Sequence, residues 1–105
     1  MIKSIIQHTQ MVKLYEILPH TKKQAKKLGV RVFPSEKKSK KIDVCDKDGY
    51  LVASVGARRY KDYPTYLKED GKKYADERRK LYKIRHNKHR NIAGSPSFYA
   101  DKLLW

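Results

Sequence analysis

The sequence predicts an α+β fold, with a small antiparallel sheet of about three or four strands followed by one long basic helix and a short C-terminal helix. Three features predict it: turn residues between two β-rich runs near the middle, an amphipathic pattern over residues 72–89, and a serine–proline segment before an apolar end. A chain of 105 residues forms one small domain. We place this domain at residues 12–105, after an N-terminal extension of residues 1–11 in which Met11 is a second possible start.

The first third of the chain has two strand patterns separated by a basic segment. VKLYEILP, residues 12–19, alternates in polarity until a proline stops it, which predicts a strand. HTKKQAKKLG predicts a helix of about two turns, with Thr21 as a possible cap and Gly29 after its end. VRVFP, residues 30–34, predicts a short strand, and residues 35–41 contain no apolar side chain and predict an exposed loop.

A hairpin in the middle of the chain is the clearest local prediction. Two β-rich runs, Ile42–Cys45 and Tyr50–Val55, flank the turn sequence DKDG. The turn resembles the start of a calcium loop, but it lacks the later acidic ligands and the closing glutamate. We therefore expect this segment to be scaffold and not a metal site.

The rest of the chain is predicted to be a loop followed by two helices. Residues 57–71 are rich in tyrosine and contain Pro64 and Gly71, which indicates a crossing loop. A helix should run from Lys72 to about His89. Its predicted apolar stripe is Tyr74, Leu81 and Ile84, with Ala75 and Tyr82 at the margin. After NIAGSPS breaks this helix, Ser95 or Ser97 should cap a final helix in which Phe98, Leu103 and Leu104 face inward.

The net charge of +15, from 26 lysines and arginines against 11 aspartates and glutamates, is the strongest functional signal. Because like charges repel and disfavour the compact state, we expect an anionic partner: nucleic acid, an acidic protein surface or an anionic membrane. A membrane is the least favoured, since no apolar run approaches the roughly 20 residues of a spanning helix. The single cysteine, Cys45, excludes an intrachain disulfide and fits a reducing compartment.

Two groups of basic residues are the candidate contacts, because lysine and arginine neutralise phosphates without regard to sequence. The candidates for binding nucleic acid or an acidic partner are Arg58, Arg59, Arg78, Arg79, Lys83, Arg85, Lys88 and Arg90. Among them lie Tyr60, Tyr63 and Tyr66, for which two interpretations stay open: stacking on unpaired bases, or packing in the core. We expect charge reversal at Arg78, Arg79 and Lys83 to weaken anion binding without unfolding the domain.

The apolar end of the chain also has two interpretations. Phe98, Leu104 and Trp105 form an apolar patch that needs to be covered. The patch either folds back on the sheet or docks into a neighbouring molecule, where a tryptophan is a frequent interface hot spot.

Catalytic and metal chemistry find little support. Asp43, Asp46, Asp48 and Asp62 lie at a turn and a loop, without the paired arrangement that a magnesium nuclease needs. His86 and His89 are three residues apart on a basic helix, but a metal site needs further ligands. The other histidines and the cysteine, His8, His20 and Cys45, are distant in sequence. We expect no enzyme activity, no metal, no cofactor and no small-molecule substrate.

Several segments resemble a family of short basic proteins encoded by large double-stranded DNA viruses, algal viruses among them. The matching stretches are KLYEILP, KKIDV, YKDY, ERRKLYKIRH and GSPSFYADKLLW, which begin at Lys13, Lys40, Tyr60, Glu77 and Gly94. The run of arginine and histidine followed by YADKLLW is the specific part. The resemblance implies location in the virion, and in the host cell interior during assembly, but it implies no activity because the family has none assigned.

Two functions are open in that setting. In the first, the protein binds nucleic acid electrostatically for packaging or condensation. In the second, it is a minor capsid protein that docks to acidic capsid neighbours through its basic helix and terminal tryptophan. A magnesium-dependent nuclease is a third and less favoured possibility.

Overall fold

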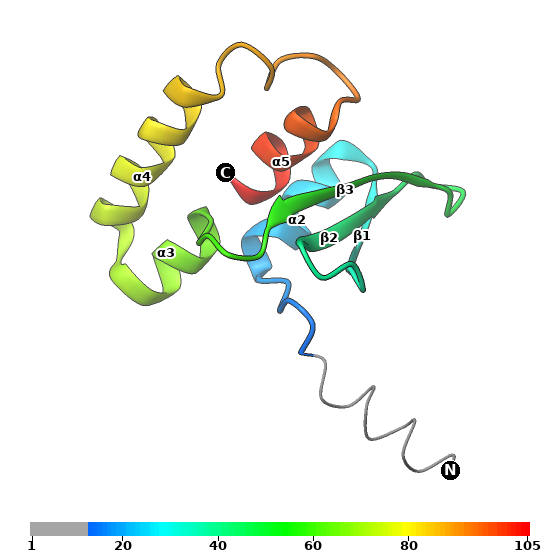
Figure 1. Cartoon of the computed structure of the whole chain (residues 1–105), viewed down its shortest axis with the longest axis horizontal. Coiled ribbons are helices and arrows are strands. Elements are labelled where there is room, and N and C mark those ends of the chain that lie inside the picture. Colours follow the sequence, from blue (N-terminus) through cyan, green and yellow to red (C-terminus); the bar gives the residue numbers. More distant parts are fainter. Residues whose placement is uncertain (1–12) are drawn as a thin grey trace.

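The computed structural model describes residues 13–105, and over these residues the fold is α+β, as predicted (Figure 1). A three-stranded antiparallel sheet in the order β1-β2-β3 and four helices make up this part of the chain. In chain order the elements are α2 (Pro19–Leu28), β1 (Arg31–Pro34), β2 (Lys40–Cys45), β3 (Leu51–Ala57), α3 (Tyr63–Asp70), α4 (Lys72–Arg85) and α5 (Pro96–Leu104). The predicted N-terminal extension, residues 1–11, and Val12 lie outside the described residues.

Helix α2 occupies the place where the first strand was predicted to end. The strand prediction is wrong, because residues 13–18 have no regular secondary structure and Pro19 begins α2. Proline suits the first helical turn, where its missing N–H would have no partner anyway. Gly29 ends the helix in the left-handed region at φ 72°, as predicted. Thr21 is not the cap: it lies within the helix, and its hydroxyl donates to the carbonyl of Leu103 at 2.8 Å.

The sheet confirms the predicted hairpin. Strand β2 pairs antiparallel with β3, with Ile42 opposite Val55, and with β1 on its other edge. The Asp46 carboxylate accepts hydrogen bonds from the backbone N–H of Asp48 at 2.9 Å and of Tyr50 at 3.0 Å, which holds the turn. The exposed loop predicted for residues 35–41 is shorter than expected, since Lys40 and Lys41 belong to β2 and Lys41 is buried.

One apolar core joins the sheet to the helices on either side of it in sequence. Its buried members are Ala25 of α2, Ile42 and Val44 of β2, Ala53 and Val55 of β3, and Leu103 and Leu104 of α5. Figure 1 shows α2 and α5 beside the strands that supply these residues. The end of the chain therefore packs against the middle of the sheet, which fixes where Trp105 lies.

Helix α3 lies inside the segment that was predicted to be a loop. Asp62 is its N-cap and accepts a hydrogen bond from the backbone N–H of Thr65 at 3.0 Å, with Pro64 in the first turn. The proline thus begins a helix here and does not interrupt one. Helix α4 follows directly after Gly71, and Figure 1 shows the two helices joined at an angle to one side of the sheet.

Helix α4 differs from its prediction in length and in the side that it buries. It ends at Arg85 and not near His89. Ala75 and Tyr82, placed at the margin of the apolar stripe, are its buried residues. The predicted stripe is exposed, at 45% for Tyr74, 50% for Leu81 and 66% for Ile84. The reason is the partner: the ring of Trp105 packs on Tyr82 and so selects that side of the helix.

Helix α5 begins as predicted. Ser95 is the N-cap and accepts a hydrogen bond from the backbone N–H of Phe98 at 3.1 Å, followed by Pro96 in the first turn. Leu103 and Leu104 face inward as expected, whereas Phe98 is half-buried. Within residues 13–105, no helix combines the length and the apolar character that crossing a membrane requires.

Candidate nucleic-acid interface

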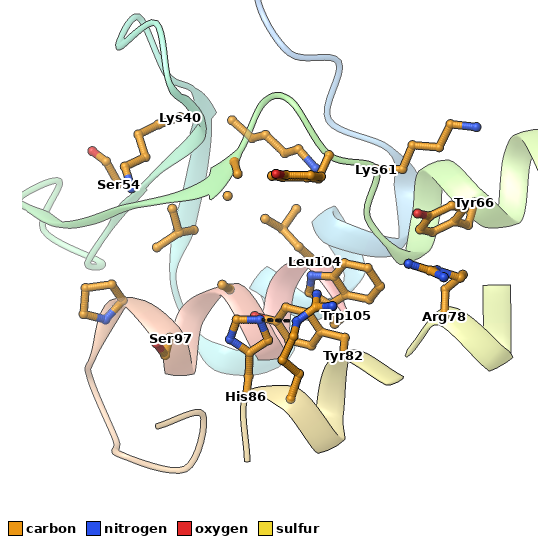
Figure 2. Close-up of a pocket in the computed structure, with 18 residues that line it drawn as sticks. Lys40, Ser54, Lys61, Tyr66, Arg78, Tyr82, His86, Ser97, Leu104 and Trp105 are labelled. Carbon is orange, nitrogen blue, oxygen red and sulfur yellow. Dashed lines mark hydrogen bonds between the residues drawn. The ribbon is translucent and has the colours of Figure 1, made fainter. Parts of the chain in front are cut away.

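A cavity of about 610 Å³ lies between β3, α4 and α5. Figure 2 shows Lys40 and Ser54 at one end of it, Tyr66 and Arg78 at the other, and the rings of Tyr82, His86 and Trp105 along one wall. The basic side chains that line it are Lys40, Lys41, Lys61, Arg78 and Arg85. No aspartate or glutamate is among the described residues that line the cavity, so its lining has a strong excess of positive charge.

An aromatic stack forms the wall of this cavity. The ring of Tyr82 lies 4.3 Å from that of Trp105 at an angle of 7°, and 4.2 Å from that of His86 at 24°. Tyr66 adds a fourth ring, tilted by 49° at 6.2 Å from Trp105. Tyr60 also lines the cavity and is 69% exposed. The cavity therefore combines flat aromatic surfaces with cations, which suits a planar anionic ligand.

Arg78 is the basic residue best placed to meet such a ligand. Its guanidinium carbon lies 5.7 Å from the centroid of the Tyr66 ring, within the range of a cation–π contact. Its Nε is buried and has no hydrogen-bond partner among the described residues. Arg78 as a whole lines the cavity, and none of the side-chain hydrogen bonds within residues 13–105 uses its guanidinium, so an acceptor that enters the cavity would find its terminal N–H groups without a protein partner.

Burial changes the acid–base properties of the ring wall. Burial, followed by the positive charge of Arg85, lowers the pKa of His86, so the imidazole is neutral near pH 7. Burial and the negative charge of Asp101 raise the pKa of Tyr82 to about 12, which keeps its hydroxyl protonated. The wall is therefore uncharged, and the cavity owes its charge to lysine and arginine.

Four of the eight predicted contact residues are engaged within the chain. Arg58 donates to three backbone carbonyls, those of Lys40, Lys13 and Ser35, at 2.6, 3.0 and 2.7 Å. The other engaged residues are Arg79, whose guanidinium lies 3.9 Å above the ring of Tyr63, and Lys83 and Arg90, which lie 2.7 and 3.8 Å from the carboxylate of Asp101. These four stabilise the fold, a role that their charge alone did not reveal.

The other four predicted contact residues have no ion pair within residues 13–105: Arg59, Arg78, Arg85 and Lys88. Arg59 precedes α3, Arg78 and Arg85 lie on α4 at the cavity, and Lys88 lies in the turn after α4. All but Arg78 are exposed. Lys40, which the sequence did not suggest, joins them at the other end of the cavity.

The three predicted stacking tyrosines separate into two groups. Tyr63 is 5% exposed and its hydroxyl donates to Asp76 at 2.9 Å, so it belongs to the core and not to a stacking surface. Tyr60 and Tyr66 line the cavity, which leaves their predicted stacking role possible. Trp105 is an aromatic residue of the site that the sequence analysis did not assign to stacking. Tyr82 is 7% exposed and packs on the Trp105 ring, so it supports the wall and offers no free surface itself.

The predicted docking segment is occupied within its own chain. Leu104 is 1% exposed, which contradicts a docking role because no surface is left to meet a partner. Trp105 and Phe98 are half-buried, and the Trp105 ring packs on Tyr82. Of the two interpretations of this segment, the structure shows folding back.

The candidate catalytic carboxylates have structural roles and do not meet. Asp62 is fully buried, where it accepts hydrogen bonds from the Tyr15 hydroxyl at 2.6 Å and from Lys41 Nζ at 2.9 Å. Burial alone would raise the pKa of Asp62, but the charge of Lys41 and the hydrogen bonds to the carboxylate outweigh burial and lower it. Asp43 accepts from the Ser54 hydroxyl, and Asp46 holds the hairpin turn. Within the described part of the chain, no three metal-ligating side chains gather at one point.

Comparisons of the chain with protein-family models, with curated proteins and with solved structures give no match.

Proposed function

We propose that this chain is a virus-encoded, non-enzymatic basic protein, associated with the virion, that binds nucleic acid electrostatically during packaging or condensation. The observation with the most weight is the division of its cations. Arg59, Arg78, Arg85 and Lys88 have no ion pair within residues 13–105, in a chain whose net charge is +15. Cations that the fold does not use are the ones available to neutralise phosphates.

The viral setting in this proposal rests on the resemblance of the Glu77–His86 and Gly94–Trp105 segments to short basic proteins of large DNA viruses. These two segments contact each other in the fold. Tyr82 of the first stacks on Trp105 of the second, and Lys83 of the first pairs with Asp101 of the second.

The test is the salt dependence of duplex DNA binding. A fluorescein-labelled duplex should bind with an affinity that falls steeply as salt rises, since each neutralised phosphate contributes about −0.9 to the log–log slope. Engagement of the four predicted contact residues that have no ion pair within residues 13–105 predicts a slope of about −3 to −4. A flat slope, or no binding at low ionic strength, would contradict the proposal.

A second candidate function is docking to an acidic capsid protein through α4. The observation that favours it is the exposed row of Tyr74, Leu81 and Ile84, whose spacing of seven and three residues places them on one side of the helix. In this version the helix alone makes the contact, because Leu104 lies in the chain's own core. Retention of the protein in purified shells after nuclease treatment, together with its release by Leu81→Ser, would favour docking over nucleic-acid binding.

A further inference from the structure

We infer that the cavity between α4 and the sheet binds a single unpaired nucleotide, with the base against the ring wall and the phosphate toward Arg78. This inference rests on the proposed function and deepens it, because it names the form of nucleic acid that the site selects. Electrostatic binding along the surface tolerates a duplex, whereas a cavity lined by rings requires a base that has left the stack.

The size and chemistry of the cavity fit this ligand. Its volume of about 610 Å³ lies within the range of roughly 300–1,000 Å³ that is typical of small-molecule sites. Tyr60, Tyr66 and Trp105 line it and supply flat surfaces on which every base can stack, independent of sequence. Its lining has no aspartate or glutamate among the described residues, so a phosphate meets no repulsion from the side chains around it.

Three cations are placed to meet the phosphate. Lys41 and Lys61 also line the cavity, but Lys41 pairs with Asp62 at 2.9 Å and Lys61 with Glu69 at 2.9 Å. Lys40, Arg78 and Arg85 have no carboxylate partner within residues 13–105. Lys40 reaches the cavity from β2, and Arg78 and Arg85 reach it from positions two turns apart on α4; Figure 2 shows Lys40 and Arg78.

Arg78 is the residue that distinguishes this site from a generally basic surface. Its Nε is buried without a hydrogen-bond partner, while its guanidinium faces the ring of Tyr66. The guanidinium lines the cavity at the edge of the Tyr66 ring, where its terminal N–H groups would donate to the phosphate of a stacked nucleotide. An arginine on the open surface donates its hydrogen bonds to water, so it has no unsatisfied donor for a ligand to pair.

The chain has its own probe for this site, because Trp105 is its single tryptophan and lines the cavity. The experiment titrates the full chain with four ligands: a single-stranded ten-nucleotide oligodeoxyadenylate, the corresponding duplex, deoxyadenosine 5′-monophosphate and inorganic phosphate. Trp105 fluorescence reports the cavity, and the anisotropy of a labelled strand reports total binding. We expect the single strand and the mononucleotide to quench Trp105, and the duplex and inorganic phosphate to leave it unchanged.

Arg78→Gln and Arg59→Gln form the matched pair, since each removes one cation and only Arg78 lines the cavity. Arg78→Gln should weaken binding of the single strand by about tenfold, the loss typical of a charged hydrogen bond. Arg59→Gln should weaken it by a smaller factor, because its charge is exposed and screened by salt. Arg85→Gln, on an exposed residue of the cavity, is the second variant if Arg78→Gln does not fold.

The outcomes separate the cavity from the general function. Duplex and single strand that bind equally, with unquenched Trp105 and equal losses from the two variants, would overturn the nucleotide site and leave electrostatic binding intact. Quenching by the mononucleotide without binding of either strand would retain the nucleotide chemistry, assign it to a free nucleotide and overturn the proposed function. If inorganic phosphate quenched Trp105 as strongly as the mononucleotide does, the inference that a base binds against the ring wall would be wrong.

Discussion

Helix α4 has cations on two of its sides, and the two sides differ in what they do. On one side, Arg79 lies over Tyr63 and Lys83 binds the buried Asp101, so both join α4 to neighbouring helices. On the other, Arg78 and Arg85 line the cavity and have no ion pair within residues 13–105. The cations of α4 therefore have two roles, stabilising the fold and lining the cavity. The contacts of each side chain distinguish these roles, whereas the residue type does not.

The comparison also revises a variant suggested by the sequence. Reversing Arg78, Arg79 and Lys83 together was expected to weaken anion binding without unfolding the domain. Two of the three hold the fold, so that variant would mix a loss of stability with a loss of binding. The predictions that follow keep the two effects separate.

The largest effect is expected where a fold-supporting cation neutralises a buried carboxylate. Asp101 is fully buried, and Lys83 Nζ lies 2.7 Å from one of its oxygens, while the other oxygen has no hydrogen bond and Arg90 and Lys102 lie farther away, at 3.8 and 3.6 Å. Lys83→Met would leave this charge without its main partner and should lower the free energy of unfolding by about 3 kcal/mol.

The control for Lys83→Met is Lys88→Met, which removes the same charge three residues after α4 ends, at an exposed position. It should change the stability by less than about 0.5 kcal/mol. Urea unfolding followed by circular dichroism measures both. Equal midpoints for the two variants would break the distinction between engaged and unengaged cations.

A smaller effect should follow from disturbing the contact that places Trp105 at the cavity. A Cβ added at Gly56 would lie 2.7 Å from Leu104 Cδ1, and this glycine has φ +87°. Gly49 has a similar φ of +91° but nothing within 4 Å, so Gly49→Ala adds backbone strain without a clash. Each should lose about 1 kcal/mol to strain, and Gly56→Ala about 1 kcal/mol more to overpacking. Thermal melts of the two variants that coincide would mean that α5 does not press on β3 as described.

The smallest expected effect is a pH dependence of stability that comes from His20. Burial, followed by the charge of Arg79, lowers the pKa of His20, whose Nε2 is buried without a partner among the described residues. The unfolded chain therefore binds the proton at a higher pH than the folded chain, near its ordinary value of about 6.5. Stability should be constant above about pH 7.5 and should decrease as the pH falls below about 6.5.

His20→Gln should remove part of that decrease in a series of thermal melts, and replacement of the exposed His89 by Gln should leave it unchanged. Asp62 does not contribute to this decrease near pH 6. Its pKa is lowered from 3.8, so it changes the stability only at pH values below about 4. A decrease that persists in full in His20→Gln would exclude His20 as its source.

The sequence predicted those elements that local chemistry determines. The DKDG hairpin, Gly29 after α2 and the Ser95 cap of α5 each depend on residues next to one another in the chain. Helix α3 was missed although its local signal was present, since an aspartate followed by proline in the next turn is typical of a helix start. Pro64 was instead taken as a break.

The errors concern segments whose structure depends on distant partners. Residues 13–18 alternate like a strand because Tyr15 and Ile17 pack against the core, yet they pair with no strand among the described residues. The cavity itself could not be predicted, because Tyr82 and Trp105 are 23 positions apart and only the fold brings their rings together. Likewise, nothing in the sequence separated Lys83, which binds Asp101, from Lys88, which is exposed.

The most direct test compares two double variants that remove the same charge from the two groups of cations. Arg59→Gln with Lys88→Gln removes unengaged cations, and Arg79→Gln with Arg90→Gln removes engaged ones. The log–log salt slope of DNA binding should become shallower by about 1.8 in the first and remain unchanged in the second, at a temperature where circular dichroism shows both folded. Equal changes of slope in the two variants would contradict the division of cations on which the account depends.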